Sequence, residues 1–189
     1  MNRIAQSIKN RLSLRPPQAD SMNILAELTD KLTLKKHTPN PLSRGEHKSP
    51  LLGGDLGVGS FLQQELEKVK TSYPTCADFE RNFPSLCFAL ATGVGKTRLM
   101  GAFIAYLYLS KGIKHYFVLA PNITIYHKLI EDFSNPNCPK YVFQGIGEFV
   151  HNQPRIITGD NYKEIRQTKK DFVSDIHINI FNISKINAE

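Results

Sequence analysis

Apolar positions along the chain change their spacing twice, and these changes divide it into three parts. In the first part, leucines recur at helical spacing and predict an amphipathic helix over residues 21–35: Leu25, Leu28 and Leu32. The second part loses this spacing and is rich in Pro, Gly and Ser, as a loop or linker is. We therefore expect an N-terminal helical arm over residues 1–36, a flexible linker over 37–60 and a folded domain over 61–189.

From Ser60 onward, local signals mark where three helices begin or end. Ser60 and Gln63 have the spacing of a capping box, so a helix is expected to begin at Ser60. Residues 96–111 carry apolar side chains at helical spacing and are followed by Gly112, a frequent helix stop. A further helix is expected directly after Pro121 and Asn122.

Short apolar runs alternate with these helices and predict strands. The candidates are residues 86–90, 115–120, 141–143, 155–157 and 176–183. Runs that are apolar throughout, without alternation, are typical of parallel strands buried on both faces. Strands that alternate with helices in this way indicate an α/β fold with a mostly parallel sheet.

The run Ala91–Thr97, which reads ATGVGKT, lies between the first of these strands and the helix over 96–111. Glycines in such a turn let successive backbone N–H groups point at phosphate oxygens, and the helix that follows adds the positive end of its dipole. A lysine there supplies charge to the β- and γ-phosphates of ATP, and a threonine hydroxyl can bind Mg²⁺. The predicted nucleotide-binding residues are Thr92, Gly93, Val94, Gly95, Lys96 and Thr97, with Thr97 as the Mg²⁺ ligand.

The loop departs from the general phosphate-loop pattern at one position. That pattern places glycine six residues before the lysine, where this chain has Leu90. The alternative is a simple glycine turn that leaves Lys96 on the surface.

Composition narrows the class of protein further. The formal charge is +7, from 24 Lys and Arg against 17 Asp and Glu, which suits a polyanionic partner without proving one. No apolar run approaches the roughly 20 residues that cross a bilayer. The N-terminus lacks the apolar block of a secretion signal, and the three cysteines do not form a disulfide framework. These features indicate a cytoplasmic protein with reduced thiols.

The segment ALATGVGKTRLM resembles the first motif of superfamily 2 helicases and translocases, and is most similar to the restriction subunit of type III restriction-modification enzymes. Three further segments resemble other parts of these motors: residues 12–18 (LSLRPPQ), 118–122 (VLAPN) and 178–185 (INIFNISK). The resemblance implies an incomplete RecA-like phosphate-loop domain, preceded by the helical arm.

The same resemblance implies roles for single residues outside the phosphate loop. Gln18 would hydrogen-bond the adenine edge, because a primary amide donates and accepts at once. Pro121 and Asn122 would contact the DNA backbone, and Ser184 and Lys185 would meet a nucleic-acid phosphate. Their alternatives are ordinary structural roles: a loop glutamine, a turn with a helix cap, and a solvated lysine.

The resemblance also implies a reaction, ATP hydrolysis coupled to movement on double-stranded DNA, with Mg²⁺ as cofactor and a methyltransferase subunit that reads the DNA site. The acidic motif of such motors begins with Asp-Glu, and the chain contains no Asp-Glu pair and no nuclease motif. We therefore expect the N-terminal part of a larger enzyme, or a truncated product that does not hydrolyse ATP alone. Two alternatives stay open: a non-catalytic nucleotide- or DNA-binding remnant, and an unrelated small phosphotransferase.

Overall fold

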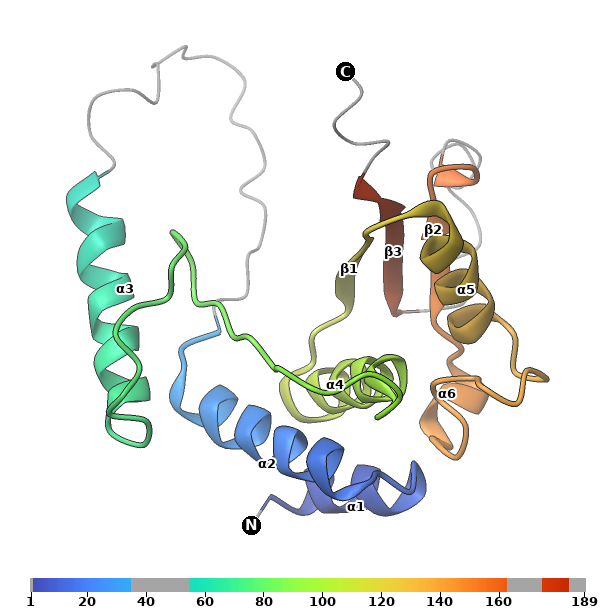
Figure 1. Ribbon diagram of the computed structural model, residues 1–189, viewed down its shortest axis with the longest axis horizontal. Helices are drawn as coiled ribbons and strands as arrows, with labels where there is room; N and C mark the ends of the chain where they lie inside the picture. Colours follow the sequence, from blue (N-terminus) through green and yellow to red (C-terminus); the bar gives the residue numbers. More distant parts are fainter. Residues whose placement is uncertain (1, 35–54, 163–174, 184–189) are drawn as a thin grey trace. The chain divides into compact units, whose positions relative to one another are not determined.

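A computed structural model of the chain contains α-helices and one β-sheet (Figure 1). It describes residues 2–34, 55–162 and 175–183. The chain forms two compact units, one from Met1–Asn23 with Leu90–Glu189 and the other from Ile24–Ala89. No helix among the described residues combines the length and the apolar character that a membrane span requires.

The linker expected over 37–60 lies outside the described residues as far as position 54. Its last part, residues 55–60, is helical, because helix α3 spans Asp55–Lys70. The prediction that this helix begins at Ser60 is therefore wrong. The Gln63 side chain does not turn back toward a cap but donates to Glu67 in the next turn, at 2.8 Å.

The unit Ile24–Ala89 holds α3 and the second half of α2, which spans Pro16–Lys31. Its core joins one face of each helix to an aromatic ring of the segment that follows α3. The core residues are Leu28, Leu32, Leu66, Val69 and Phe79. The leucine spacing that predicted a helix over 21–35 therefore marks the buried face of α2 correctly, although α2 begins and ends several residues earlier than predicted.

The other unit contains the sheet and most of the helices. Besides the start of α2, its elements are α1 (Arg3–Arg11), α4 (Lys96–Lys111), β1 (His115–Ala120), α5 (Ile123–Ser134), α6 (Glu148–His151), β2 (Arg155–Thr158) and β3 (His177–Asn182). The helix over 96–111 and the strands over 115–120, 155–157 and 176–183 are thus confirmed, with small shifts at their ends.

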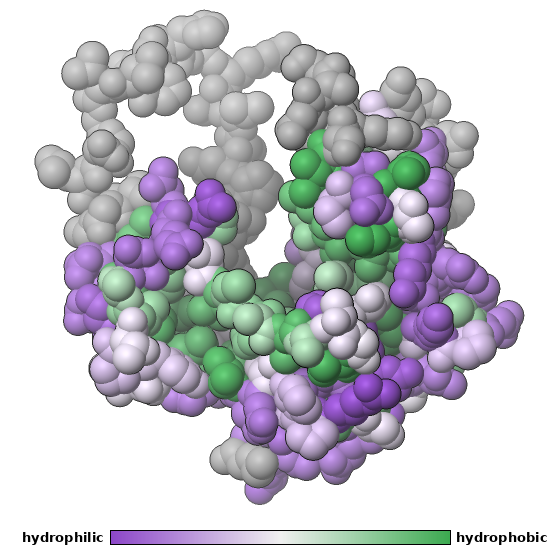
Figure 2. All heavy atoms as spheres, in the orientation of Figure 1, coloured by the Kyte–Doolittle hydropathy of each residue, from purple (hydrophilic) through white to green (hydrophobic). Residues whose placement is uncertain are grey.

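The three described strands are all parallel, as the sequence predicts. Their order in the sheet is β1-β3-β2. Helix α5 contacts all three strands and covers one face of the sheet (Figure 1). Val118, Ile178 and Ile180 are buried on that face, while Phe117 on the opposite face is 61% exposed. Figure 2 shows apolar surface over these strands.

Helix α4 is held by contacts on several sides. It ends at Gly112, whose left-handed φ of +66° and backbone N–H bonds to the last turn form the predicted stop. Tyr106 is fully buried, and its hydroxyl accepts a hydrogen bond from the Asn2 amide at 2.9 Å. A Cβ on Gly101 would lie 2.6 Å from the Val142 Cβ, so α4 packs closely against the segment after α5.

Two of the predicted strands are absent from the structure. Residues 86–90 form no regular structure, and Leu86 is 38% exposed. An apolar run becomes a strand only where a neighbouring strand pairs with it, and residues 86–90 pair with none of the three described strands. Residues 141–143 form a turn, although they are buried. Their apolar side chains reflect packing rather than strand pairing.

Candidate functional site

The predicted phosphate loop is a tight turn directly before α4. Gly93 has φ +79° and Gly95 has φ +94°, both in the left-handed region that favours glycine. Gly95 occupies the position before the first residue of α4, and the first turn of that helix contains no acidic residue. The turn therefore places backbone N–H groups and an uncompensated helix N-terminus together, an arrangement that suits an anion.

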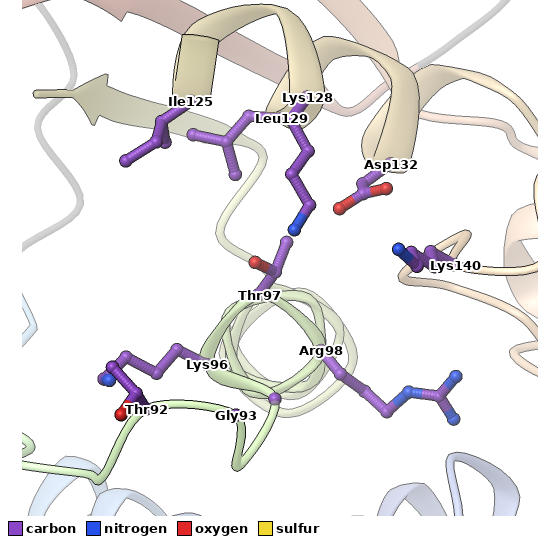
Figure 3. A pocket seen from close by; sticks show the side chains of 11 residues that line it. Thr92, Gly93, Lys96, Thr97, Arg98, Ile125, Lys128, Leu129, Asp132 and Lys140 are labelled. Carbon is purple, nitrogen blue, oxygen red and sulfur yellow. The ribbon is translucent and has the colours of Figure 1, made fainter. Parts of the chain in front are cut away.

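Lys96 and Thr97 are the first two residues of α4. The Lys96 side chain is exposed, and its Nζ donates to the Ala91 carbonyl at 3.1 Å. Thr97 is half-buried and lies between the two sides of the site (Figure 3). Val94 does not line the cavity beside the loop.

A cavity of about 610 Å³ opens beside the loop (Figure 3). One wall comes from the loop and α4, the other from α5 and the segment after it. The lining residues are Thr92, Gly93, Gly95, Lys96, Thr97, Arg98, Ile125, Lys128, Leu129, Asp132 and Lys140. Five of the six predicted nucleotide-binding loop residues thus share one cavity.

The N-terminal segment that contains Gln18 lies against the loop. Gln18 is the third residue of α2 and is only 2% exposed, so it is not a loop residue. Its Nε2 donates to the Gly95 carbonyl at 2.8 Å, and its Oε1 accepts from the Arg15 backbone N–H at 2.8 Å. The structure brings Gln18 to the phosphate loop, and its contact with adenine stays a prediction.

The α5 wall of the cavity was not recognised from the sequence. Lys128 points toward Thr97, while the side chains of Asp132 and Lys140 lie next to each other (Figure 3). Asp132 is 4% exposed, and its carboxylate accepts no hydrogen bond from a described residue. Its position seven residues after Ile125, on a helix face that also carries Leu129, is the sequence signal that indicates burial.

Replacing Asp132 by asparagine is expected to stabilise the fold at neutral pH. Burial raises the pKa of the Asp132 carboxyl, and the charges of Lys128 and Lys140 offset this only in part. In the unfolded chain an Asp carboxyl ionises above a pH of about 3.9, its ordinary pKa. Above that pH the raised pKa of the folded state lowers the stability of the protein, and below it the effect vanishes. Thermal melts should show a midpoint higher by about 2–4 °C near pH 7, the equivalent of about 1 kcal/mol. The difference should shrink toward pH 4, so a pH-independent difference would contradict this reading of Asp132.

The residues expected to contact DNA are placed only in part. Pro121 and Asn122 follow the carboxyl end of β1 and are both exposed. The Asn122 Oδ1 caps α5 by accepting from the Ile125 N–H at 2.9 Å. Ser184 and Lys185 lie outside the described residues.

The described residues hold no group of three or more His, Cys, Asp or Glu side chains that could bind a metal ion.

Comparisons with known proteins agree with the geometry of the loop. The sequence matches the family described as type III restriction enzyme, res subunit, over residues 11–189. It is 31% identical over 109 residues to the probable type III restriction-modification enzyme HindVIP Res subunit of Haemophilus influenzae. That alignment covers 56% of this chain and 19% of the relative, so the chain spans a small part of the relative's length. No solved structure gives a significant match.

Proposed function

The chain belongs to the res subunit family of type III restriction enzymes, and on that premise we propose that it binds Mg²⁺–ATP as the N-terminal nucleotide-binding part of a DNA translocase. The observation that carries the proposal is the loop with two left-handed glycines before α4, which opens on the cavity of about 610 Å³. Backbone N–H groups of the loop and the Lys96 ammonium would hold the phosphates. The Thr97 hydroxyl would bind Mg²⁺.

The chemistry of the site follows from its groups. The helix N-terminus and Lys96 both favour negative charge, and no carboxylate of the first turn of α4 opposes them. Arg98, Lys128 and Lys140 add positive charge around the same cavity. The positive field of the cavity therefore favours a polyphosphate ligand over a neutral one.

Calorimetric titration of the chain with ATP in the presence of Mg²⁺ tests this proposal. We expect ATP to bind saturably. Inorganic tripolyphosphate should compete with ATP for the site, because most of the contacts are to phosphate. If neither ATP nor tripolyphosphate gives a heat of binding, the proposed nucleotide site is wrong.

Contact with double-stranded DNA is the second part of the proposal. Asn122 follows the carboxyl end of a parallel strand, where open α/β sheets present their ligands. Its Oδ1 is used by the helix cap, while its amide nitrogen donates to no described residue and can donate to a DNA phosphate. A methyltransferase subunit would supply recognition of the DNA sequence in the complete enzyme.

Replacing Asn122 by aspartate should weaken binding to duplex DNA by about tenfold, because a hydrogen bond to a charged phosphate is lost and a like charge is added. Aspartate is as good a helix N-cap as asparagine, so α5 should keep its stability. Asn135→Asp makes the same charge change at the other end of α5 and is the matched control. Fluorescence anisotropy with a labelled duplex measures the affinity of both variants for DNA. An equal loss of affinity in the two variants would mean that net charge explains the effect and that Asn122 makes no specific contact.

A further inference from the structure

Two backbone carbonyls of the phosphate loop are held by the segment before and at the start of α2. Arg15 Nη1 donates to the Gly93 carbonyl at 3.2 Å, and Gln18 Nε2 donates to the Gly95 carbonyl at 2.8 Å. A third bond runs the other way, from Arg98 Nη1 on α4 to the Leu12 carbonyl at 3.0 Å. The loop is therefore tied to the N-terminal segment on both of its sides.

The Gln18 amide can occupy this place in one orientation only. The Arg15 backbone N–H can only donate, so it requires Oε1, and the Gly95 carbonyl can only accept, so it requires Nε2. The contact is also close, because a Cβ on Gly95 would lie 2.7 Å from Nε2. Burial of Gln18 in turn keeps water from competing for these bonds.

Holding a carbonyl also fixes the N–H of the next residue. The peptide bond is planar, and in the trans form its C=O and N–H point in opposite directions. The Gly95 carbonyl accepts from Gln18 Nε2 and also from the Leu99 N–H at 3.1 Å, the first backbone bond of α4. The two bonds together keep the Lys96 N–H on the opposite side. Arg15 acts in the same way through the Gly93 carbonyl on the Val94 N–H.

We propose that Gln18, assisted by Arg15, is a positioning residue for the phosphate loop: together with the first backbone bond of α4, it holds the Gly95–Lys96 peptide with its N–H toward the phosphates and its carbonyl away from them. This inference rests on the proposed nucleotide site and gives Gln18 a role that does not depend on the base. The bond from Gln18 fixes the junction of the loop and α4 more firmly than the helix bond alone, so its loss weakens every polyphosphate ligand alike.

Positioning and adenine recognition by Gln18 predict different binding patterns. An adenine reader lowers affinity for ATP and leaves GTP and inorganic tripolyphosphate unchanged. A positioning residue lowers affinity for all three by the same factor.

The test uses Gln18→Met, which keeps the length of the side chain and removes both hydrogen-bonding groups. We expect Mg²⁺–ATP, Mg²⁺–GTP and tripolyphosphate each to bind about five- to tenfold more weakly, as for one lost hydrogen bond in a buried site. The control is Gln63→Met, on an exposed position of α3, which should leave all three affinities unchanged. Thermal melts identify any loss that is due to unfolding.

Amide NMR signals of the free protein give a second readout that general destabilisation would not reproduce. Gln18→Met should shift mainly the Lys96 amide signal, and Arg15→Ala should shift mainly that of Val94. Unchanged affinities in Gln18→Met, a loss confined to ATP, or equal shifts at both amides in both variants would overturn the positioning role. Wild-type protein that binds none of the three ligands would overturn the nucleotide site itself, which separates the two failures.

Discussion

Replacing Lys96 by alanine should weaken Mg²⁺–ATP binding at least about tenfold, because a hydrogen bond to a charged group is worth roughly 1.5–3 kcal/mol. Lys96 begins α4, where the helix dipole and its ammonium act on the same phosphates. Its one described hydrogen bond, to the Ala91 carbonyl, is at the surface, so the variant should fold normally. Titration calorimetry on wild type and variant gives the two dissociation constants.

Lys128→Ala is the matched control for this experiment. Lys128 lines the same cavity from α5, but it does not belong to the phosphate loop. Its loss should therefore cost less affinity than the loss of Lys96. Equal binding by wild type and Lys96→Ala would reject the phosphate-loop hypothesis. Equal losses of affinity in Lys96→Ala and Lys128→Ala would mean that only the net charge of the cavity matters for binding.

Much of the fold could be predicted from local patterns. Helix α4, strand β1 and helix α5 combine clear periodicity with local stop and start signals, Gly112 and Asn122, that act within one turn of the chain. These signals depend on neighbouring residues only, so the sequence contains them directly. The parallel arrangement follows from the alternation of strand and helix.

The errors concern properties that depend on distant partners. Residues 86–90 and 141–143 are both short apolar runs, and a run of this length predicts a strand only if another strand is available to pair with it. The first run is partly exposed and the second is buried in a turn, yet their sequences look alike. Tertiary packing, not local pattern, decides between these outcomes.

In the candidate site too, features set by neighbouring residues could be predicted from the sequence, and contacts between distant residues could not. The loop residues are consecutive, so their place in one turn directly before α4 could be predicted from one short motif. The bond between Gln18 and Gly95 joins residues 77 positions apart, and no spacing rule predicts which atoms of Gln18 are used. The packing of α5 places Asp132 in the cavity wall. No recognisable motif surrounds this residue, so the sequence does not predict its place in the site.

The 189-residue chain is expected to bind ATP without hydrolysing it, with or without DNA. Phosphoryl transfer depends on residues that orient the attacking water and stabilise the charge that develops on the γ-phosphate. Among the described residues lining the cavity, Asp132 is the one carboxylate. The sequence contains no Asp-Glu pair of the kind that would complete the metal site.

Binding alone does not lower the barrier to hydrolysis, because contacts made equally in the ground state and the transition state leave the chemical step unchanged. An arginine finger accounts for about 10³–10⁵ in rate in ATPases and GTPases, and turnover without one is very slow. Phosphate release by the wild-type chain should therefore equal that of Lys96→Ala, in a coupled assay with and without duplex DNA. The threshold for rejecting this prediction is a DNA-stimulated rate of about 0.1 per second that requires Lys96. This threshold is well below the usual enzyme range of about 1–10³ per second. Even that rate would show that residues of this chain orient the water, and Asp132 would be the first to replace.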